Sequence, residues 1–73
     1  MRREPTALGR AIRRRLKELG KTQMWLEEQV EDRTGLFFDN SYLWKIIVGE
    51  LATPRIVEAI REILDIPEEE SEE

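Results

Sequence analysis

The 73-residue chain contains no cysteine and no histidine. Disulfides, thiolate metal ligands, the usual zinc sites and histidine-based acid–base catalysis are therefore excluded. A chain without cysteine is compatible with a reducing compartment, and we expect a cytoplasmic protein. Its apolar runs are at most three residues long, as in 36–38 and 46–48. We therefore expect no membrane-spanning helix and no signal-peptide core.

Signatures of catalysis are scarce as well. The sequence has four glycines, none of them in a glycine-rich phosphate loop, and no pair of carboxylates that a cleft would enclose. We expect no enzyme activity, no cofactor and no metal site. A chain of this length should form one small domain whose core is only marginally stabilising.

The net charge of −4 argues at first sight against a polyanionic partner, but the charges are segregated. Residues 68–73 carry five glutamates, and without them the chain would have a net charge of +1. Residues 1–22 contain eight basic and two acidic residues. A basic beginning and an acidic end are typical of interaction surfaces.

Helix start and stop signals predict an all-α fold with four helices. The expected helices are 6–19, capped by Thr6 and ended by Gly20; 22–33, capped by Thr22 and ended before Gly35; 40–48, capped by Asp39 or Asn40 and ended by Gly49; and 54–64, capped by Thr53 with Pro54 at its first position. The expected organisation is a basic arm at 1–5, a compact four-helix domain at 6–66 and a disordered acidic tail at 67–73.

Apolar residues at helical spacing define the expected core. Its members are Leu8, Ile12, Leu16 and Leu19 in the first helix, Leu26 and Val30 in the second, Leu43, Ile46 and Ile47 in the third, and Ile56, Val57, Ala59, Ile60, Ile63 and Leu64 in the fourth, with Ile66 covering its end. We expect Met24 and Trp25 to pack against the first helix or the following loop. At least one of Phe37 and Phe38 should fill the core, whereas two exposed phenylalanines would indicate a protein partner.

The segment 39–49 has two chemically different faces. Its outer face carries Asn40, Ser41, Trp44, Lys45 and Val48. Amide, hydroxyl and cationic side chains near a helix N-terminus can reach base edges and phosphates in the major groove of DNA. The alternative is a core helix with an ordinary solvated face. Trp44 and Val48 could pack on thymine methyls, form a dimer contact or turn partly into the core.

A stripe of cations follows one side of the first helix and continues past its end. The stripe consists of Arg10, Arg13, Arg14, Lys17 and Lys21. It favours phosphate contact through counterion release, or else a solvated face partly paired with the acidic second helix. Gln23 opens the second helix, where its amide could reach a phosphate or an adenine edge, or could complete the capping network.

Taken together, these motifs resemble a known family. The motifs are Leu8-Gly9, Ile12, Leu16, Gly20, Thr22-Gln23, Leu26, Ser41-Tyr42-Leu43, Lys45-Ile46, Gly49 and Asp65-Ile66. Over about residues 7–66 the chain resembles the lambda-repressor/Cro-type (XRE) helix-turn-helix proteins, and more loosely their small phage or mobile-element regulators. The resemblance implies base contacts by Gln23, Asn40, Ser41, Trp44 and Lys45. It also implies that Tyr42 approaches a phosphate. Together with the cationic stripe and the start of the second helix, the candidate phosphate contacts are Arg10, Arg13, Arg14, Lys21, Thr22 and Tyr42.

Two features depart from the family pattern. The chain between Gln23 and Tyr42 is longer than usual by about one and a half helical turns, which predicts an extended second helix, a loop, or both. Glu27 stands where the family has a small residue. Its carboxylate should reach solvent or find a cation, for example from the first helix.

The leading hypothesis is a sequence-specific regulator that binds double-stranded DNA through the helix at 40–48, as a homodimer reading two half-sites. One alternative is a protein-interaction module on a helix-turn-helix scaffold, acting through Trp44, Val48 and the phenylalanines. Another is a DNA-binding recombination or architectural accessory protein.

Overall fold

Four helices make up the fold in this computed structural model, which describes residues 6–51 and 53–67. They are α1 (Ala7–Leu19), α2 (Gln23–Thr34), α3 (Asn40–Ile47) and α4 (Pro54–Leu64). The predicted all-α, four-helix class is confirmed. The predictions for the basic arm at 1–5 and the acidic segment at 68–73 lie outside the described residues.

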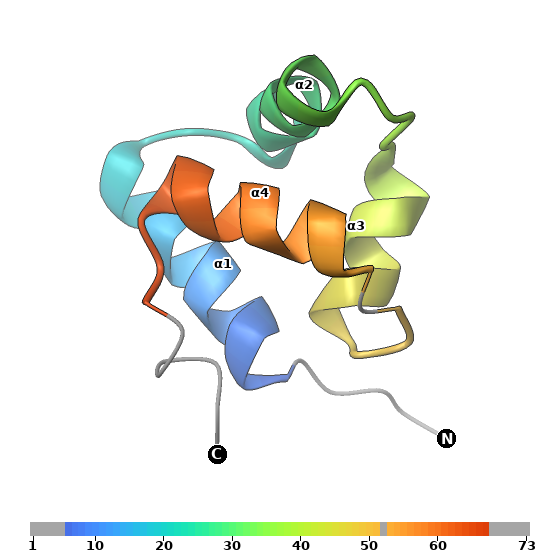
Figure 1. The fold of residues 1–73 in the computed structure, drawn as a ribbon. Coiled ribbons are helices and arrows are strands. Elements are labelled where there is room, and N and C mark those ends of the chain that lie inside the picture. Colours follow the sequence, from blue (N-terminus) through green and yellow to red (C-terminus); the bar gives the residue numbers. More distant parts are fainter. Residues whose placement is uncertain (1–5, 52, 68–73) are drawn as a thin grey trace.

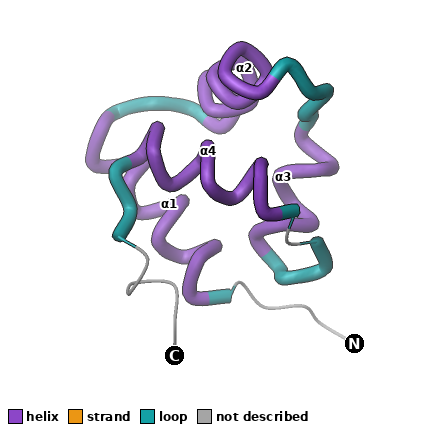
Figure 2. The backbone as a smooth tube through the Cα atoms, viewed as in Figure 1, coloured by secondary structure: helices purple, strands orange, loops and turns teal. Residues whose placement is uncertain are grey.

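Helix α4 lies at the centre of the arrangement (Figure 1). It packs most extensively against α2 on one side and also contacts α1, while α3 contacts both α1 and α2. Figure 2 shows α2 nearly end-on above α4, with the 35–39 connection leading to α3 at the edge of the molecule. Each helix contributes to a single core, whose largest fully buried side chains include Phe38, Leu26, Leu43 and Ile60.

The predicted N-caps are present on the first three helices. The Thr6 hydroxyl accepts a hydrogen bond from the Gly9 amide at 3.1 Å, and the Thr22 hydroxyl accepts one from the Trp25 amide at 3.0 Å. Of the two candidates for α3, Asp39 is the cap, because its carboxylate accepts from the Tyr42 amide at 2.9 Å. Each cap satisfies an amide that the first turn would leave unpaired.

Three predicted boundary features need correction. Helix α2 continues to Thr34, whose hydroxyl donates to the Val30 carbonyl at 2.8 Å and so stays within the helical pattern. Helix α3 ends at Ile47 with Val48 as its cap, and Gly49, at φ 84°, lies in the turn beyond. Thr53 precedes α4, but its side chain makes no cap. Its hydroxyl is instead 2.8 Å from the Tyr42 hydroxyl.

Two residues expected in the core lie on the surface. Leu19 is 41% exposed because α1 ends there and the chain turns away at Gly20. Met24 is 67% exposed, although its neighbour Trp25 packs partly against the core as expected. Val48 was placed on the outer face of the third helix, with a turn partly into the core as one alternative. That alternative is confirmed, because Val48 follows the last residue of α3 and is partly buried against the core.

The long connection between α2 and α3 combines an extended helix with a loop. Phe38 fills the core at 1% exposure, which confirms the prediction for one phenylalanine, whereas Phe37 is 73% exposed. The Phe38 amide donates to the Glu31 carboxylate at 2.9 Å. The Phe38 and Tyr42 rings are 5.1 Å apart between centroids. These contacts hold the start of α3 against α2.

Candidate nucleic-acid interface

Helix α3 presents a polar outer face, as predicted. Asn40, Ser41 and Lys45 are exposed and Trp44 is 48% exposed. On the opposite side, Leu43, Ile46 and Ile47 are each at most 2% exposed. The apolar side therefore fixes the helix on the core, and the four candidate base-contact side chains of α3 remain accessible.

The N-terminus of α1 is joined to the C-terminus of α3 through one backbone carbonyl. The Ile47 carbonyl accepts from the Thr6 amide at 2.9 Å and from the Thr6 hydroxyl at 3.0 Å. A Cβ on Gly9 would lie 2.3 Å from the same oxygen. Only a glycine permits this approach of the two helices.

We define the cationic face of α1 as Arg10, Arg13, Arg14 and Lys17, all of which are exposed. Gly9 marks the side of α1 that touches α3. Arg13 follows Gly9 by four residues and so lies on the same side, one turn further along. The cationic face therefore begins at the edge that α1 shares with α3.

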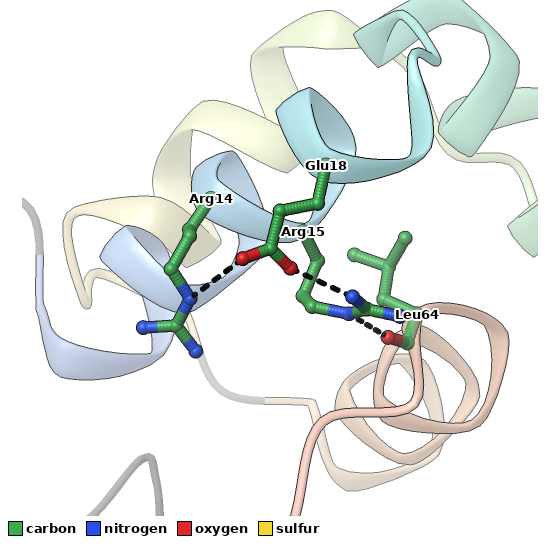
Figure 3. A network of polar contacts seen from close by, with 4 residues as sticks. All are labelled: Arg14, Arg15, Glu18 and Leu64. Atoms are coloured by element: carbon green, nitrogen blue, oxygen red, sulfur yellow. Dashed lines mark hydrogen bonds and ion pairs between the residues drawn. The ribbon is translucent and has the colours of Figure 1, made fainter.

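The other edge of this face borders α4, as Figure 3 shows. The Arg15 Nε donates to the Leu64 carbonyl at 2.7 Å, and its guanidinium also donates to Glu18 at 2.7 Å. The opposite oxygen of Glu18 is 3.9 Å from the Nε of Arg14. Arg15 thus anchors α1 to the end of α4, and Glu18 neutralises part of the charge along this edge.

Of the three candidate residues at the start of α2, two make side-chain contacts within the described fold and one does not. The Lys21 ammonium lies 5.3 Å from the centroid of the Trp25 ring, a cation–π contact. Thr22 is the cap of α2. Gln23 is exposed in the first turn, and among the described residues no hydrogen bond of its side chain is recorded. Of these three side chains, Gln23 is the most available for a ligand.

Tyr42 ties α3 to the start of α4. Its hydroxyl is hydrogen-bonded to the Thr53 hydroxyl and its ring packs on Phe38. The side chain is only partly exposed. A phosphate contact at Tyr42 would have to share this hydroxyl with Thr53, so its evident role in the structure is to hold α3 in place.

An acidic cluster at the α2–α3 junction was not foreseen. It consists of Glu27, Glu31 and Asp39 and borders the first turn of α3. Burial raises the pKa of the Glu27 carboxyl above its ordinary value of 4.5. The charges of Asp39, Glu31 and Glu28 raise this pKa further. The i, i+4 spacing of Glu27 and Glu31 is a signal in the sequence for such a cluster.

The ion pair considered between Glu27 and a cation of α1 is not seen among the described residues. Within residues 6–51 and 53–67, no ion pair of Glu27 is recorded, and its side chain is half-buried. We expected this carboxylate either to reach solvent or to find a cation. It is partly exposed to solvent and lies near the charges of Asp39, Glu31 and Glu28. The start of α3 is therefore negative, while its α1 edge is positive.

Several apolar side chains are also accessible. Phe37 is 73% exposed, Met24 67% and Trp44 48%. Single exposed apolar residues are common on proteins. The sequence analysis took two exposed phenylalanines as the sign of a protein partner, and only Phe37 of the pair is exposed.

No group of three or more acidic side chains able to hold a metal ion occurs in the part of the chain that the structure describes. None of the described helices has the length and apolar character to cross a membrane. No protein-family model, curated protein or solved structure matches this chain. The candidate site therefore depends on its own geometry and chemistry.

Proposed function

We propose that this chain is a sequence-specific double-stranded DNA-binding regulator, which places the outer face of α3 in the major groove and the cationic face of α1 against the adjacent phosphates. The amide of Asn40, the hydroxyl of Ser41 and the ammonium of Lys45 supply groups that can read base edges. Trp44 adds an apolar surface that can meet a thymine methyl. Gln23 adds an amide at the start of α2.

One observation carries the proposal: the close contact of Gly9 with the Ile47 carbonyl packs the first turn of α1, which leads into the cationic face, against the end of α3. A polar helix face and a cationic helix face cannot bind the same duplex if they point to opposite sides of a domain. Here Arg13 extends from the edge of α1 nearest α3. Groups for base reading and for phosphate binding can therefore engage one duplex together.

The number of cations predicts how steeply the affinity for DNA falls with salt concentration. Four cations on α1 and Lys45 on α3 can neutralise about four or five phosphates per protomer. Each neutralised phosphate contributes about −0.9 to the slope of log affinity against log salt. We expect a slope of about −4 per protomer for a random-sequence duplex, and roughly double if two protomers bind side by side as a homodimer on half-sites about one helical turn apart.

Charge-neutralising variants test which face binds. Arg13→Gln should weaken binding to all duplex sequences and reduce the magnitude of the salt slope by about 1. Arg33→Gln is the matched control: it removes the same charge from α2, where Arg33 pairs with Glu62 of α4 at 2.8 Å on the surface, a pair worth little to stability. Equal losses in the two variants would mean that total charge, and not the α1 face, governs binding.

Sequence selectivity needs its own test. Selection of bound oligonucleotides from a random duplex pool should return a consensus, and a palindromic one would establish paired protomers. Asn40→Ala and Lys45→Ala should relax that preference at single positions by about 1–3 kcal/mol each. An unchanged consensus in both variants would exclude α3 as the reading helix.

A second candidate function is a protein-interaction module on the same scaffold. The acidic cluster beside the start of α3 favours it, because a groove-binding surface is normally polar and positive. Absence of duplex binding at about 20 mM salt, in protein shown to be folded, would favour this function over DNA binding. A DNA-binding accessory protein of recombination or chromosome architecture would instead bind duplexes without a consensus.

A further inference from the structure

The chain leaves the described fold at a fixed point beside α1. The Leu64 carbonyl, at the end of α4, accepts from the Arg15 guanidinium of α1 at 2.7 Å. Ile66 is 4% exposed, and the Pro67 carbonyl accepts from the Arg61 guanidinium at 3.0 Å. Pro67 is therefore anchored three residues after Leu64, whose carbonyl takes part in the network at the α4 edge of the cationic face (Figure 3).

The sequence that follows this anchor complements the face in charge and length. Residues 68–73 contain five glutamates and no basic residue. Six residues can span up to about 20 Å when extended, and the 13 residues of α1 measure about 20 Å along the helix axis. Every cation of α1 is thus within reach of at least one of these carboxylates.

We propose that residues 68–73 bind the cationic face of α1 and occupy it in competition with external polyanions. Arg13 and Lys17 are the anchoring cations, because both are exposed and Glu18 contacts Arg14 and Arg15 instead. The contact is electrostatic and on the surface, so it is weak and salt-sensitive. Tethering compensates for weakness, because a short segment next to its site acts at millimolar effective concentration.

The consequence for DNA follows from the proposed function and rests on it. Phosphates and the glutamate segment would use the same cations, so binding of one excludes the other. A non-specific duplex gains affinity mainly from phosphate contacts and loses the most to this competition. A specific site gains additional affinity from α3 and can displace the segment. The segment would therefore act as a built-in filter against weak, non-specific sites.

The contact can be measured without DNA. A tail variant with Glu68→Gln, Glu69→Gln and Glu70→Gln removes three charges at unchanged length. A matched control, with Asp32→Asn, Glu58→Gln and Glu62→Gln, removes three charges from exposed positions on α2 and α4. The backbone amide NMR signals of Arg13 and Lys17, and the side-chain guanidinium signal of Arg13, should shift in the tail variant at about 20 mM salt and not in the control. The differences should vanish at about 1 M salt, where the Debye length is about 3 Å.

Affinity for a random-sequence duplex then tests the competition. The tail variant should bind about three- to tenfold more tightly than the control at low salt, the range that one or two surface ion pairs supply. Unshifted α1 signals in the tail variant would overturn the contact, whatever the DNA result. Shifted signals with equal duplex affinity in the two variants would overturn the competition. Shifted signals in a protein that binds no duplex would support the contact and refute the proposed function alone.

Discussion

Replacing Gly9 with alanine offers the sharpest test of the α1–α3 junction. In most helix interiors this change stabilises a protein by about 0.5–1 kcal/mol, because glycine loses more backbone entropy on folding. Here the added Cβ would lie 2.3 Å from the Ile47 carbonyl oxygen and 2.8 Å from the Cγ2 of the same residue. The nearest atom belongs to backbone, so the two helices must move apart.

The cost of that movement can be worked out from the contacts it disturbs. Overpacking of this kind costs about 1–3 kcal/mol. The displaced carbonyl also accepts the two hydrogen bonds from Thr6, each worth about 0.5–1.5 kcal/mol if lost. With one of the two hydrogen bonds lost and the gain in helix propensity subtracted, the net loss should be about 1–3 kcal/mol. A domain of this size has a total unfolding free energy of about 4–11 kcal/mol.

Urea unfolding followed by circular dichroism measures this loss directly. With a slope of about 1 kcal/mol per molar urea, the midpoint of Gly9→Ala should fall by about 1–3 M at unchanged slope. Gly20→Ala is a useful comparison, because no heavy atom lies within 4 Å of its added Cβ and only the backbone strain at φ 69° is tested. A Gly9→Ala protein as stable as the parent, or more so, would refute the close approach of the helices.

Three further changes probe other parts of the fold. Ile46→Ala should lower the unfolding free energy by about 2–5 kcal/mol in urea unfolding, since Ile46 is 2% exposed, whereas Lys45→Ala should change it by less than about 0.5 kcal/mol; a larger loss in Lys45→Ala than in Ile46→Ala would mean that the faces of α3 are reversed. Tyr42→Phe and Thr53→Val should each cost about 0.5–1.5 kcal/mol, and the double variant should cost less than their sum because they remove one hydrogen bond; strict additivity would argue against that bond. Glu27→Gln should stabilise the fold at neutral pH by about 0.2–0.5 kcal/mol for the like-charge pair with Glu31. Because the folded state raises the pKa of Glu27 above 4.5, its ionised carboxylate weakens the fold at neutral pH and its protonated form does not. The advantage of the variant should therefore shrink as the pH falls through the raised pKa towards 4.5 and be absent below 4.5; a constant advantage from pH 3 to pH 7 would contradict the shift.

Local signals in the sequence predicted most of the helix framework. Thr6, Thr22 and Asp39 each combine a side-chain acceptor with a following helical pattern, and capping requires only contacts three residues apart. The apolar spacing of Leu43, Ile46 and Ile47 likewise predicted the buried side of α3 correctly. Such features depend on neighbours along the chain, which the sequence displays directly.

The errors arise where long-range packing decides. Met24 and Trp25 are adjacent and both apolar, yet only Trp25 contacts the core. Thr53 has the residue type and the following proline of an N-cap, but its hydroxyl bonds to Tyr42 of another helix. Nothing in the local sequence distinguishes these outcomes, because each depends on which surface the next helix covers.

The same distinction applies to the candidate site. The cationic spacing of α1 and the polar spacing of α3 were both visible in the sequence, but the close packing of the two helices at Gly9 and Ile47 was not. The acidic cluster was missed for a related reason. Glu27 and Glu31 belong to α2, and they meet Asp39 only because Phe38 is buried and its amide bonds to Glu31.

The charge layout around α3 constrains how the proposed interface could meet a duplex. Asp39, Glu27 and Glu31 make the start of α3 negative and would repel phosphates that approach it, while Lys45 on α3 and Arg13 on α1 would attract them. A helix that enters the groove by its first turn, as in the usual helix-turn-helix arrangement, would bring this cluster towards one phosphate backbone. Tilting α3 so that its Lys45 end and the α1 edge lead would separate the carboxylates from the backbone. The physical expectation is therefore a shifted docking angle, with Lys45 and Trp44 contributing more to base reading than Asn40.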